Sequence, residues 1–250
     1  SRPQGPAWTG DYGLAFDGQD DFVEIEDLMQ VDEFSVGGRF ILYSSDGMGA
    51  FFQHKELCNV GNGWLLGYEG GSPRLWDNGG NSDCGNGSLT IGELATSYEF
   101  PLNVAFNLLF TKSSDGYSKL YVDGQLVLNA NTLANTLVEK PFYIGHWADG
   151  PNIEYTDMKL LDSYYTTTLI NENEIDDYNP VNDDNVIFNL SSGYGSEQLA
   201  YDISGNQNHG EIHGVTWMIN VIPGCTDSVA CNYNDQSTED NGTCEYVEEN

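Results

Sequence analysis

The stretch KLYVDGQLVL, residues 119–128, constrains the fold of this chain most strongly. Two runs of alternating apolar and polar residues flank the pair Asp123-Gly124. Asp-Gly suits a two-residue type I′ turn, because both central positions of that turn need a positive φ. The stretch therefore predicts a β-hairpin between two antiparallel strands.

Similar short runs recur along the chain. In the run 21–27, Val23 and Ile25 share one face, and in the run 104–110 every second residue from Val104 to Phe110 is apolar. Four more strands are predicted at 39–43, 64–68, 141–147 and 186–190. One short surface helix is predicted over 168–178. Many short strands with regular turn signals predict an all-β fold, an antiparallel sandwich of two sheets.

The charge balance of the chain excludes some partners. Lys and Arg number 8 against 39 Asp and Glu, a net charge of −31, and no Lys or Arg follows Lys159. Such a chain repels nucleic acid and anionic lipid, so neither is expected as a partner. No apolar run has transmembrane length, so membrane insertion is not expected. The acidity has two explanations: solubility in a salty medium, or carboxylates that bind calcium.

The cysteines indicate an oxidising compartment. There are five, at Cys58, Cys84, Cys225, Cys231 and Cys244, and the absence of a CxxC pair argues against zinc. Cys58 and Cys84 have polar, Gly- and Asn-rich surroundings that suit a surface disulfide. The odd number leaves one tail thiol to pair with sequence beyond Asn250 or with another chain.

Other features also predict a secreted protein, located outside the cell or on its surface. Sequons for N-glycosylation occur at Asn86, Asn189 and Asn241. No signal peptide is visible and the chain starts at Ser1, as in a mature or excised fragment. The composition changes at Pro223-Gly224, beyond which no long apolar run remains. We therefore predict a sandwich domain over 1–222 and a small module over 223–250.

Five segments together resemble a known family. They are GLAFDGQDDFVEI (13–25), FSVGGRFI (34–41), KLYVDGQLV (119–127), PFYIGHWADG (141–150) and AYDISGNQNHGEIHGVTW (200–217). They resemble the laminin-G-like, or concanavalin A-like, jelly roll over roughly residues 7 to 218. Many relatives have the last of these segments before the first. The order found here fits a permuted start if the terminal strands are neighbours in the sandwich.

The tail segment 224–246 resembles a different kind of module. Its Cys, Asp and Asn content is similar to that of the thrombospondin type 3 calcium repeats of secreted proteins. A segment this polar cannot bury a core, so disulfides and metal are expected to hold it. The alternative is a disordered acidic linker.

These resemblances imply Ca²⁺ as a cofactor. In the sandwich, the family places an ion near two loops whose oxygen donors are Asp17, Asp20, Asp21, Asp202, Asn206 and Asn208. In the tail, the candidate ligands are Asp227, Asn232, Asn234, Asp240 and Asn241. The alternative is that these side chains cap turns. His209 is expected to be a hydrogen-bonded turn residue, because His is a poor calcium ligand.

Glycan binding would require an exposed aromatic ring on which a sugar can stack. Trp64, Trp76 and Trp147 lie in or beside polar loops, and Asp149 lies close to Trp147. These four residues are the candidate ligand-binding set. The alternative for each of these Trp residues is a place in the core. Trp8 and Trp217 are expected in the core or at the sheet edge.

Catalysis finds little support. Retaining glycosidases of the concanavalin A-like fold carry an ExDxxE motif, and the similar stretch ENEIDDY (172–178) lacks the final Glu. No G-x-S-x-G and no Gly-rich phosphate loop occurs. We therefore predict a non-catalytic recognition or adhesion module that binds glycan or an extracellular protein. The alternatives are a structural subunit of an extracellular filament, sheath or virion, assembled through the tail, and a glycoside hydrolase.

Overall fold

The hairpin predicted at 119–128 is present in the structure, a computed structural model. Strands β9 (Tyr117–Val122) and β10 (Gln125–Asn131) pair in antiparallel fashion. Asp123 and Gly124 between them have φ angles of 48° and 74°, as a type I′ turn requires. The structure describes residues 13–55, 63–77, 88–90, 97–131, 137–149, 152–175, 177–196, 198–218, 223–225, 227–233, 239–240 and 243–246.

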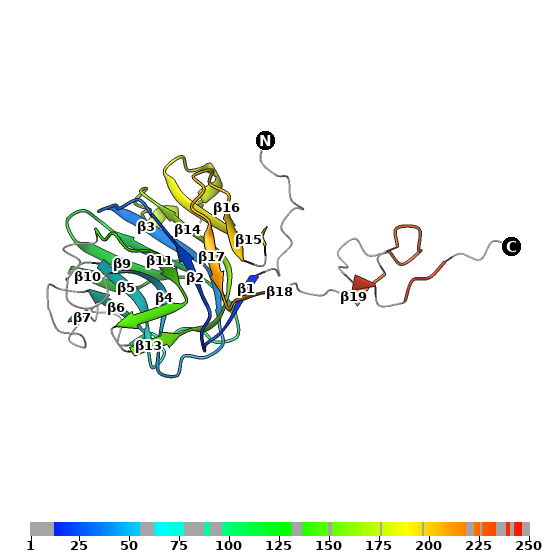
Figure 1. The fold of residues 1–250 in the computed structure, drawn as a ribbon, viewed down its shortest axis with the longest axis horizontal. Coiled ribbons are helices and arrows are strands. Elements are labelled where there is room, and N and C mark those ends of the chain that lie inside the picture. The colour runs from blue at the N-terminus through cyan, green and yellow to red at the C-terminus, as the bar shows by residue number, and fades with distance from the viewer. Residues whose placement is uncertain are drawn as a thin grey trace.

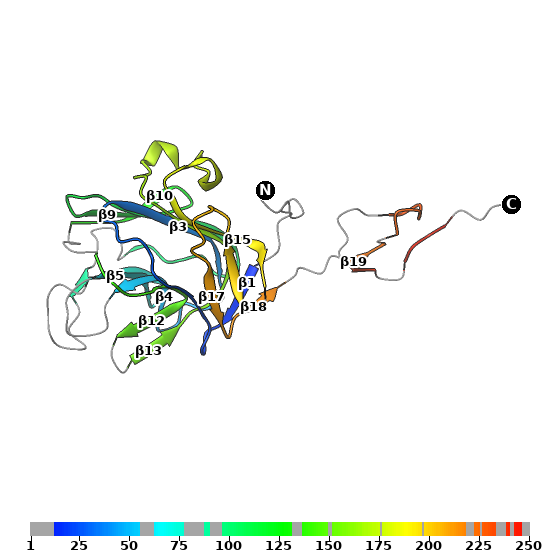
Figure 2. The ribbon, with the colours of Figure 1, turned by 45° about the horizontal axis from the view of Figure 1, so that its top comes forward.

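Two antiparallel sheets form the sandwich, as predicted (Figures 1 and 2). Besides β10 and β9, the first sheet contains in spatial order β8 (Ala105–Lys112), β3 (Phe34–Leu42), β14 (Asp157–Thr166) and β15 (Val186–Gly195). The second contains β17 (Gly210–His213), β2 (Phe22–Ile25), β11 (Phe142–Ile144), β4 (Met48–Lys55), β5 (Gly63–Glu69), β6 (Ser72–Asp77) and β7 (Ser88–Thr90). Strand β16 (Leu199–Asp202) pairs with β15 and β17 and joins the two sheets.

Aromatic side chains fill the space between the sheets. Phe34 on β3 stacks on Trp64 of β5 at 5.1 Å between ring centroids, and Tyr165 on β14 stacks on Phe142 of β11 at 5.6 Å. Trp64 is completely buried. This packing follows from the alternation of the strands, in which every second side chain faces the other sheet.

The first and last strands of the sandwich are neighbours. Strand β1 (Gly13–Asp17) pairs with β14 on one side and with β18 (Thr216–Met218) on the other. Gly13 lies opposite Met218, so the two ends of the domain meet in one sheet. This arrangement agrees with the permuted order of the family segments.

A separate hairpin covers part of the second sheet from outside. It consists of β12 (His146–Asp149) and β13 (Asn152–Tyr155), and it lies against β4 (Figure 2). Trp147 of this hairpin packs on Ala50 and Leu65 and is 6% exposed. The outer face of β4 and β5 is therefore buried as well as the inner face.

The helix predicted over 168–178 is much shorter in the structure. It is reduced to the 3₁₀ helix η2 (Glu172–Glu174), and a second 3₁₀ helix, η3 (Pro180–Asn182), follows. The side chains of Asn171 and Glu174 cap η2, and Pro180 opens η3. Asn and Asp side chains compete for backbone hydrogen bonds and thereby oppose helix growth. We call residues 168–175 and 177–183 the cover segment.

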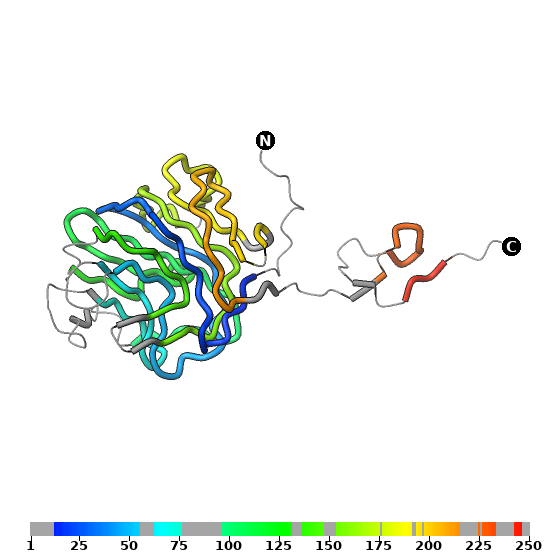
Figure 3. The backbone as a smooth tube through the Cα atoms, viewed as in Figure 1, coloured from blue at the N-terminus to red at the C-terminus, as the bar shows by residue number. Residues whose placement is uncertain are grey.

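The tail is held by a disulfide and by side chain–backbone hydrogen bonds. Its described residues (orange to red in Figure 3) lie outside the sandwich. Strands β19 (Pro223–Gly224) and β20 (Glu239–Asp240) pair in parallel, and Cys225 is bonded to Cys244. Asn232 donates to the carbonyl of Thr243 and accepts from the N–H of Glu245. Within the described parts of the chain, no helix has the length and apolar character needed to cross a membrane.

Candidate functional site

A row of polar residues crosses the outer face of the first sheet. Asn107 on β8 lies opposite Arg39 on β3, Arg39 lies opposite Asp162 on β14, and Asp162 lies opposite Ser191 on β15. We call these four residues the polar row. They are brought together by strand register alone, because residues directly opposite each other share a face.

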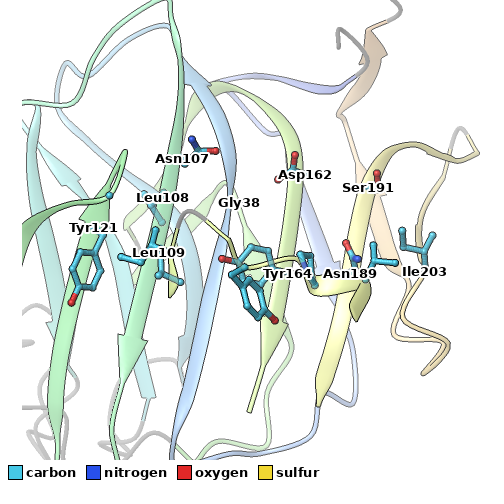
Figure 4. Close-up of a pocket in the computed structure, with 15 residues that line it drawn as sticks. Gly38, Asn107, Leu108, Leu109, Tyr121, Asp162, Tyr164, Asn189, Ser191 and Ile203 are labelled. Atoms are coloured by element: carbon cyan, nitrogen blue, oxygen red, sulfur yellow. The ribbon is translucent and has the colours of Figure 1, made fainter. Parts of the chain in front are cut away.

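A second row lies beside the polar row on the same face. Tyr121 on β9 lies opposite Leu109, Leu109 opposite Gly37, Gly37 opposite Tyr164, and Tyr164 opposite Asn189. We call these residues the aromatic row. Figure 4 shows Tyr121, Leu109, Tyr164 and Asn189 in sequence across the strands, with Asn107, Asp162 and Ser191 on the neighbouring level.

Gly37 gives the Tyr164 ring its place in the aromatic row. A Cβ atom at Gly37 would lie 2.7 Å from the Tyr164 hydroxyl and 2.7 Å from the Leu108 carbonyl oxygen. Any larger residue would therefore push the ring away from the sheet. Burial raises the pKa of Tyr164 well above its usual value, so its hydroxyl stays protonated and can donate a hydrogen bond.

The polar row carries one charge of each sign. Arg39 Nε lies 3.5 Å from Asp162 Oδ2, and both side chains are about one-third exposed. Desolvation raises the pKa of Asp162, and the nearby Arg39 guanidinium opposes that shift. The pair makes this part of the surface electrically neutral, although the whole chain is strongly acidic.

The cover segment turns the two rows into a groove. Ile170, Ile175 and Tyr178 pack over Leu109 and Tyr121. The carboxylate Oδ2 of Asp183 fixes the segment by accepting hydrogen bonds from Thr166 Oγ1 at 2.7 Å and from the Tyr178 hydroxyl at 2.8 Å. What stays open is a hollow of about 280 Å³, which we call the groove; it is lined by the members of both rows except Arg39 and Gly37.

Sequence reasoning did not identify the groove residues. The groove residues on strands come from five strands, β3, β8, β9, β14 and β15, and no local motif joins them. A weak signal exists in three strands: Arg39, Asn107 and Asp162 each interrupt an apolar run. Register was needed to show that the three interruptions coincide.

Carboxylates also gather in the turn between β1 and β2. Ligand atoms of Asp17, Asp20 and Asp21 lie within 4.8 Å of one another. Asp21 is 5% exposed, and its Oδ2 accepts a hydrogen bond from the Asp17 N–H at 2.7 Å. Burial raises the pKa of Asp21, and the charges of Asp17 and Asp20 raise it further. Clustered hard oxygen ligands fit Ca²⁺.

The second predicted calcium loop does not join this turn. Asp202, Asn206 and Asn208 lie before Gly210, the first residue of β17. The 17–21 turn lies at the opposite end of β17, where His213 pairs with Phe22. The prediction that both loops bind one ion is therefore wrong, because the loops lie at opposite ends of β17.

In that second loop the polar groups satisfy one another. The Asp202 carboxylate accepts from the backbone N–H groups of Asn189, Ser204 and Asn208. The side chains of Asn206 and Asn208 both donate to the carbonyl of Ile187. His209 is a hydrogen-bonded turn residue, as expected, since its Nδ1 accepts from the Asp202 N–H at 2.9 Å.

The predicted stacking tryptophans are not open to a ligand. Trp64 is fully buried between the sheets, and Trp147 is 6% exposed beneath its own hairpin. Trp76 is half-buried and packs against Trp147, with ring centroids 6.3 Å apart. The prediction that Trp64 or Trp147 offers a ring face is therefore wrong, because these strands are covered on both sides. The side chain of Asp149 lies outside the described residues.

In the tail, the two predicted calcium ligands whose side chains are described serve as structural acceptors. Asp227 accepts from the Val229 N–H and the Tyr246 hydroxyl, and Asn232 bridges two backbone segments. The side chains of Asn234, Asp240 and Asn241 lie outside the described residues.

The cysteine and sequon predictions have mixed outcomes. Cys231 is exposed and is the unpaired cysteine among those described, so pairing with another chain stays a prediction. Asn189 is 5% exposed in the middle of β15, so its predicted glycosylation is wrong. Cys58, Cys84 and Asn86 lie outside the described residues.

Carboxylate pairs suited to glycoside hydrolysis are not found in the groove. Among its described lining residues, Asp162 is the single carboxylate. Glu174 of the ENEIDDY stretch is exposed and accepts from Asn171 in the η2 cap. Hydrolysis of a glycosidic bond normally requires two carboxylates on opposite sides of it.

One prediction concerns the glycine that faces the acidic turn. A Cβ at Gly214 would lie 2.1 Å from Asp21 Oδ1, and Gly214 has a φ of +71°. Gly70 has a similar φ of +56° but no atom within 4 Å of a Cβ. We expect Gly214→Ala to lower the free energy of unfolding by about 2 kcal/mol more than Gly70→Ala, measured by urea denaturation. Equal losses would show that the carboxylate moves away freely.

Comparison with known proteins supports the fold. No protein-family model and no curated protein matches the sequence. Among solved structures, a candidate carbohydrate binding protein from Bacteroides ovatus aligns with a TM-score of 0.59 at 10% identity. The alignment covers 83% of this chain and 59% of that one, so the chain spans less than two thirds of the Bacteroides protein.

Two further structures align less closely. A SAP-like pentraxin from Limulus polyphemus has a TM-score of 0.49 at 14% identity, covering 66% of this chain and 80% of that one. Domain 4 of a GH43 extracellular arabinanase from Geobacillus stearothermophilus, in complex with arabinotriose, has a TM-score of 0.48 at 16% identity, covering 71% and 84%. At 10% identity the Bacteroides alignment bears on the sandwich fold alone, and no argument is based on the two alignments with TM-scores below 0.5.

Proposed function

We propose that this protein is a secreted, non-catalytic recognition module that binds glycan in the groove. The observation that carries the proposal is the pairing of the two rows. Within the groove, the polar row offers the amide of Asn107, the carboxylate of Asp162 and the hydroxyl of Ser191 to sugar hydroxyls. The aromatic row contributes the Tyr164 ring, which lines the groove beside Tyr178, for contact with the apolar side of a sugar ring. A concave site with a few convergent polar groups beside aromatic side chains is typical of small-ligand binding.

Two further observations support the proposal. The similar Bacteroides ovatus protein is described as a candidate carbohydrate binding protein. The Cys225–Cys244 disulfide fits an oxidising compartment outside the cytosol.

A glycan array tests this function directly. We expect the purified chain to bind at least one neutral plant or microbial glycan. Hydrogen exchange should then show protection of the strand segments 37–39, 107–109 and 162–164 in the complex. Binding with protection elsewhere would reject the groove, and no binding to any glycan would reject the function.

We further propose that Ca²⁺ binds the carboxylates of Asp17, Asp20 and Asp21 and thereby stabilises the turn between β1 and β2. The raised pKa of Asp21 indicates that its charge is unfavourable in the ion-free protein. A divalent cation would relieve the repulsion among the three carboxylates. The ion would sit at the rim of the sandwich, on a loop separate from the groove residues.

The calcium proposal predicts a change in thermal stability. Saturating Ca²⁺ should raise the Tm by about 5–10 °C, the shift that about 2–3 kcal/mol of ligand stabilisation gives a domain of this size. Asp21→Asn keeps an acceptor for the Asp17 N–H but removes one charge. We expect this variant to melt no lower than the wild type in EDTA and to lose the response to Ca²⁺.

The exposed Asp115, in the turn between β8 and β9, provides the control for the calcium experiment. Asp115→Asn should keep the full calcium response. An unchanged Tm on adding Ca²⁺ to the wild type would reject the site. A response that survives Asp21→Asn would place the ion elsewhere, for example in the tail.

A further inference from the structure

A second hollow adjoins the groove on the same side of the molecule. Val181 and Ile203 line both, so the two hollows share a wall. The second hollow measures about 530 Å³. Its other walls come from β15, β16 and the loop before β17, through Tyr194, Tyr201 and His209. Figure 4 shows Ile203 at the end of the groove beyond Asn189.

Hydrogen bonds fix the second hollow relative to the groove. Asn189, the last member of the aromatic row, donates its backbone N–H to Asp202 Oδ1 at 2.8 Å. Its carbonyl oxygen accepts from the Ile203 N–H at 2.9 Å. Asp202 is 7% exposed and also holds the loop through Ser204. The backbone of Asn189 therefore connects the end of the groove to Asp202 and Ile203 of the second hollow.

The second hollow offers an aromatic ring and a neutral donor. Tyr201 is 38% exposed, and the His209 ring packs against it with centroids 5.5 Å apart. Because His209 Nδ1 accepts a hydrogen bond from the Asp202 N–H, the neutral imidazole carries its proton on Nε2. An exposed tyrosine ring beside an N–H donor can hold a sugar unit by stacking and by a hydrogen bond to a hydroxyl.

Charge selects the class of ligand. All described residues that line the second hollow except Val181 come after residue 193, and the sequence contains no Lys or Arg beyond Lys159. The described residues that line the groove include no Lys or Arg, and Arg39 beside it is paired with Asp162. Neither hollow therefore presents an uncompensated cation, and the net charge of −31 repels anions at a distance. Uronates and sulfated sugars do not fit such a surface.

We propose that the groove and the second hollow form one extended binding surface for an uncharged oligosaccharide. Successive units of the chain occupy the groove, cross the Val181–Ile203 wall and reach Tyr201. This inference rests on the proposed glycan-binding function and adds to it the length and charge of the ligand. Val181 is 50% exposed, so the shared wall presents an apolar side chain to a ligand that spans both hollows.

Titration with ligands of defined length tests the inference. The probes are neutral arabino-, xylo-, cello- and manno-oligosaccharides of two and six units, with hexagalacturonate as the anionic comparison. For the series that binds, we expect the hexamer to bind about tenfold more tightly than the dimer, a difference of about 1.4 kcal/mol. Tyr201→Ala should remove this gain and leave the dimer affinity unchanged. Hexagalacturonate should not compete.

The control is Tyr117→Ala, which removes a tyrosine that is 47% exposed but lines neither hollow. It should keep the full length dependence, and circular dichroism should show both variants folded. Hydrogen exchange provides an independent measurement: the hexamer should protect 201–209 and the dimer should not.

The failure of this inference differs from the failure of the proposed function. The extended surface is rejected if dimer and hexamer bind with equal affinity, or if Tyr201→Ala keeps the higher affinity for the hexamer. In either case the proposal that the groove binds glycan is unaffected. Tight binding of hexagalacturonate would overturn the uncharged ligand. If no probe binds the wild type and the glycan array is also negative, both proposals fall.

Discussion

Replacing Trp64 by alanine should lower the free energy of unfolding by about 3–5 kcal/mol, the usual cost of truncating a buried Trp. Trp64 is completely buried and contacts Phe34 at 5.1 Å and Phe110 at 5.2 Å in the first sheet and Phe142 at 6.1 Å in the second. The cavity left behind would remove these contacts. In a domain of this size the loss corresponds to a fall in Tm of about 10 °C, measured by calorimetry.

Trp64→Phe is the matched variant for this experiment. The indole Nε1 of Trp64 has no hydrogen-bond partner within the described part of the structure, so phenylalanine removes an unsatisfied donor while keeping a ring. We expect it to cost far less stability than alanine. Neither variant should change the affinity of the folded fraction for glycan. If a variant lost glycan binding without losing stability, Trp64 would contribute to the ligand-binding site.

Asp162→Asn should reduce glycan affinity about 10- to 100-fold, measured by titration calorimetry. Asp162 lies at the centre of the polar row, opposite Arg39 on one side and Ser191 on the other. Hydrogen bonds to charged groups contribute about 1.5–3 kcal/mol, more than those between neutral groups. The asparagine keeps the shape of the side chain but loses the charge that neutralises Arg39.

The two controls for Asp162→Asn separate local from global effects. Asp115→Asn removes an exposed carboxylate outside the groove and should leave affinity unchanged. Asp162→Asn should retain the native Tm within a few degrees, since both side chains of the Arg39 pair are about one-third exposed and surface pairs contribute little to stability. Unchanged glycan affinity in Asp162→Asn would exclude the polar row as the binding site.

The sequence predicts much of this fold because the strands are amphipathic. Val23 and Ile25 alternate with polar residues, and both are completely buried. Phe106, Leu108 and Phe110 are alternate residues of β8 and are also buried. Val104, in contrast, lies before the strand and is 54% exposed. Asp123-Gly124 predicts its own turn, since few residues other than glycine and aspartate tolerate positive φ. Sequence alternation is sufficient to predict a strand wherever one face of the strand contacts solvent and the other is buried.

Sequence alternation fails to predict exposure where both faces of a strand are buried. In β5, Trp64 faces the core between the sheets, while Leu65 faces the hairpin that carries Trp147. An apolar run of this kind has no alternation, so the sequence cannot tell which tryptophan is exposed. The β12–β13 hairpin that decides the matter packs on β4, a strand about 100 residues earlier in the chain.

The groove was beyond sequence reasoning for a related reason. Arg39, Asn107, Asp162 and Ser191 are neighbours only because four strands pair in one register. A shift of one residue in any strand would place its polar side chain on the inner face. The acidic turn was easier, because Asp17, Asp20 and Asp21 are close in the sequence and therefore close in space.

The pairing of β1 with β18 has a consequence for biosynthesis. Strand β1 leaves the ribosome long before one of its partners, β18, which is made about 200 residues later. Until then β1 has an open edge in which unpaired backbone groups invite other chains. Contacts this distant also slow folding. Nascent or truncated chains should therefore depend on chaperones until residue 218 is available, even though the finished domain is closed along this edge.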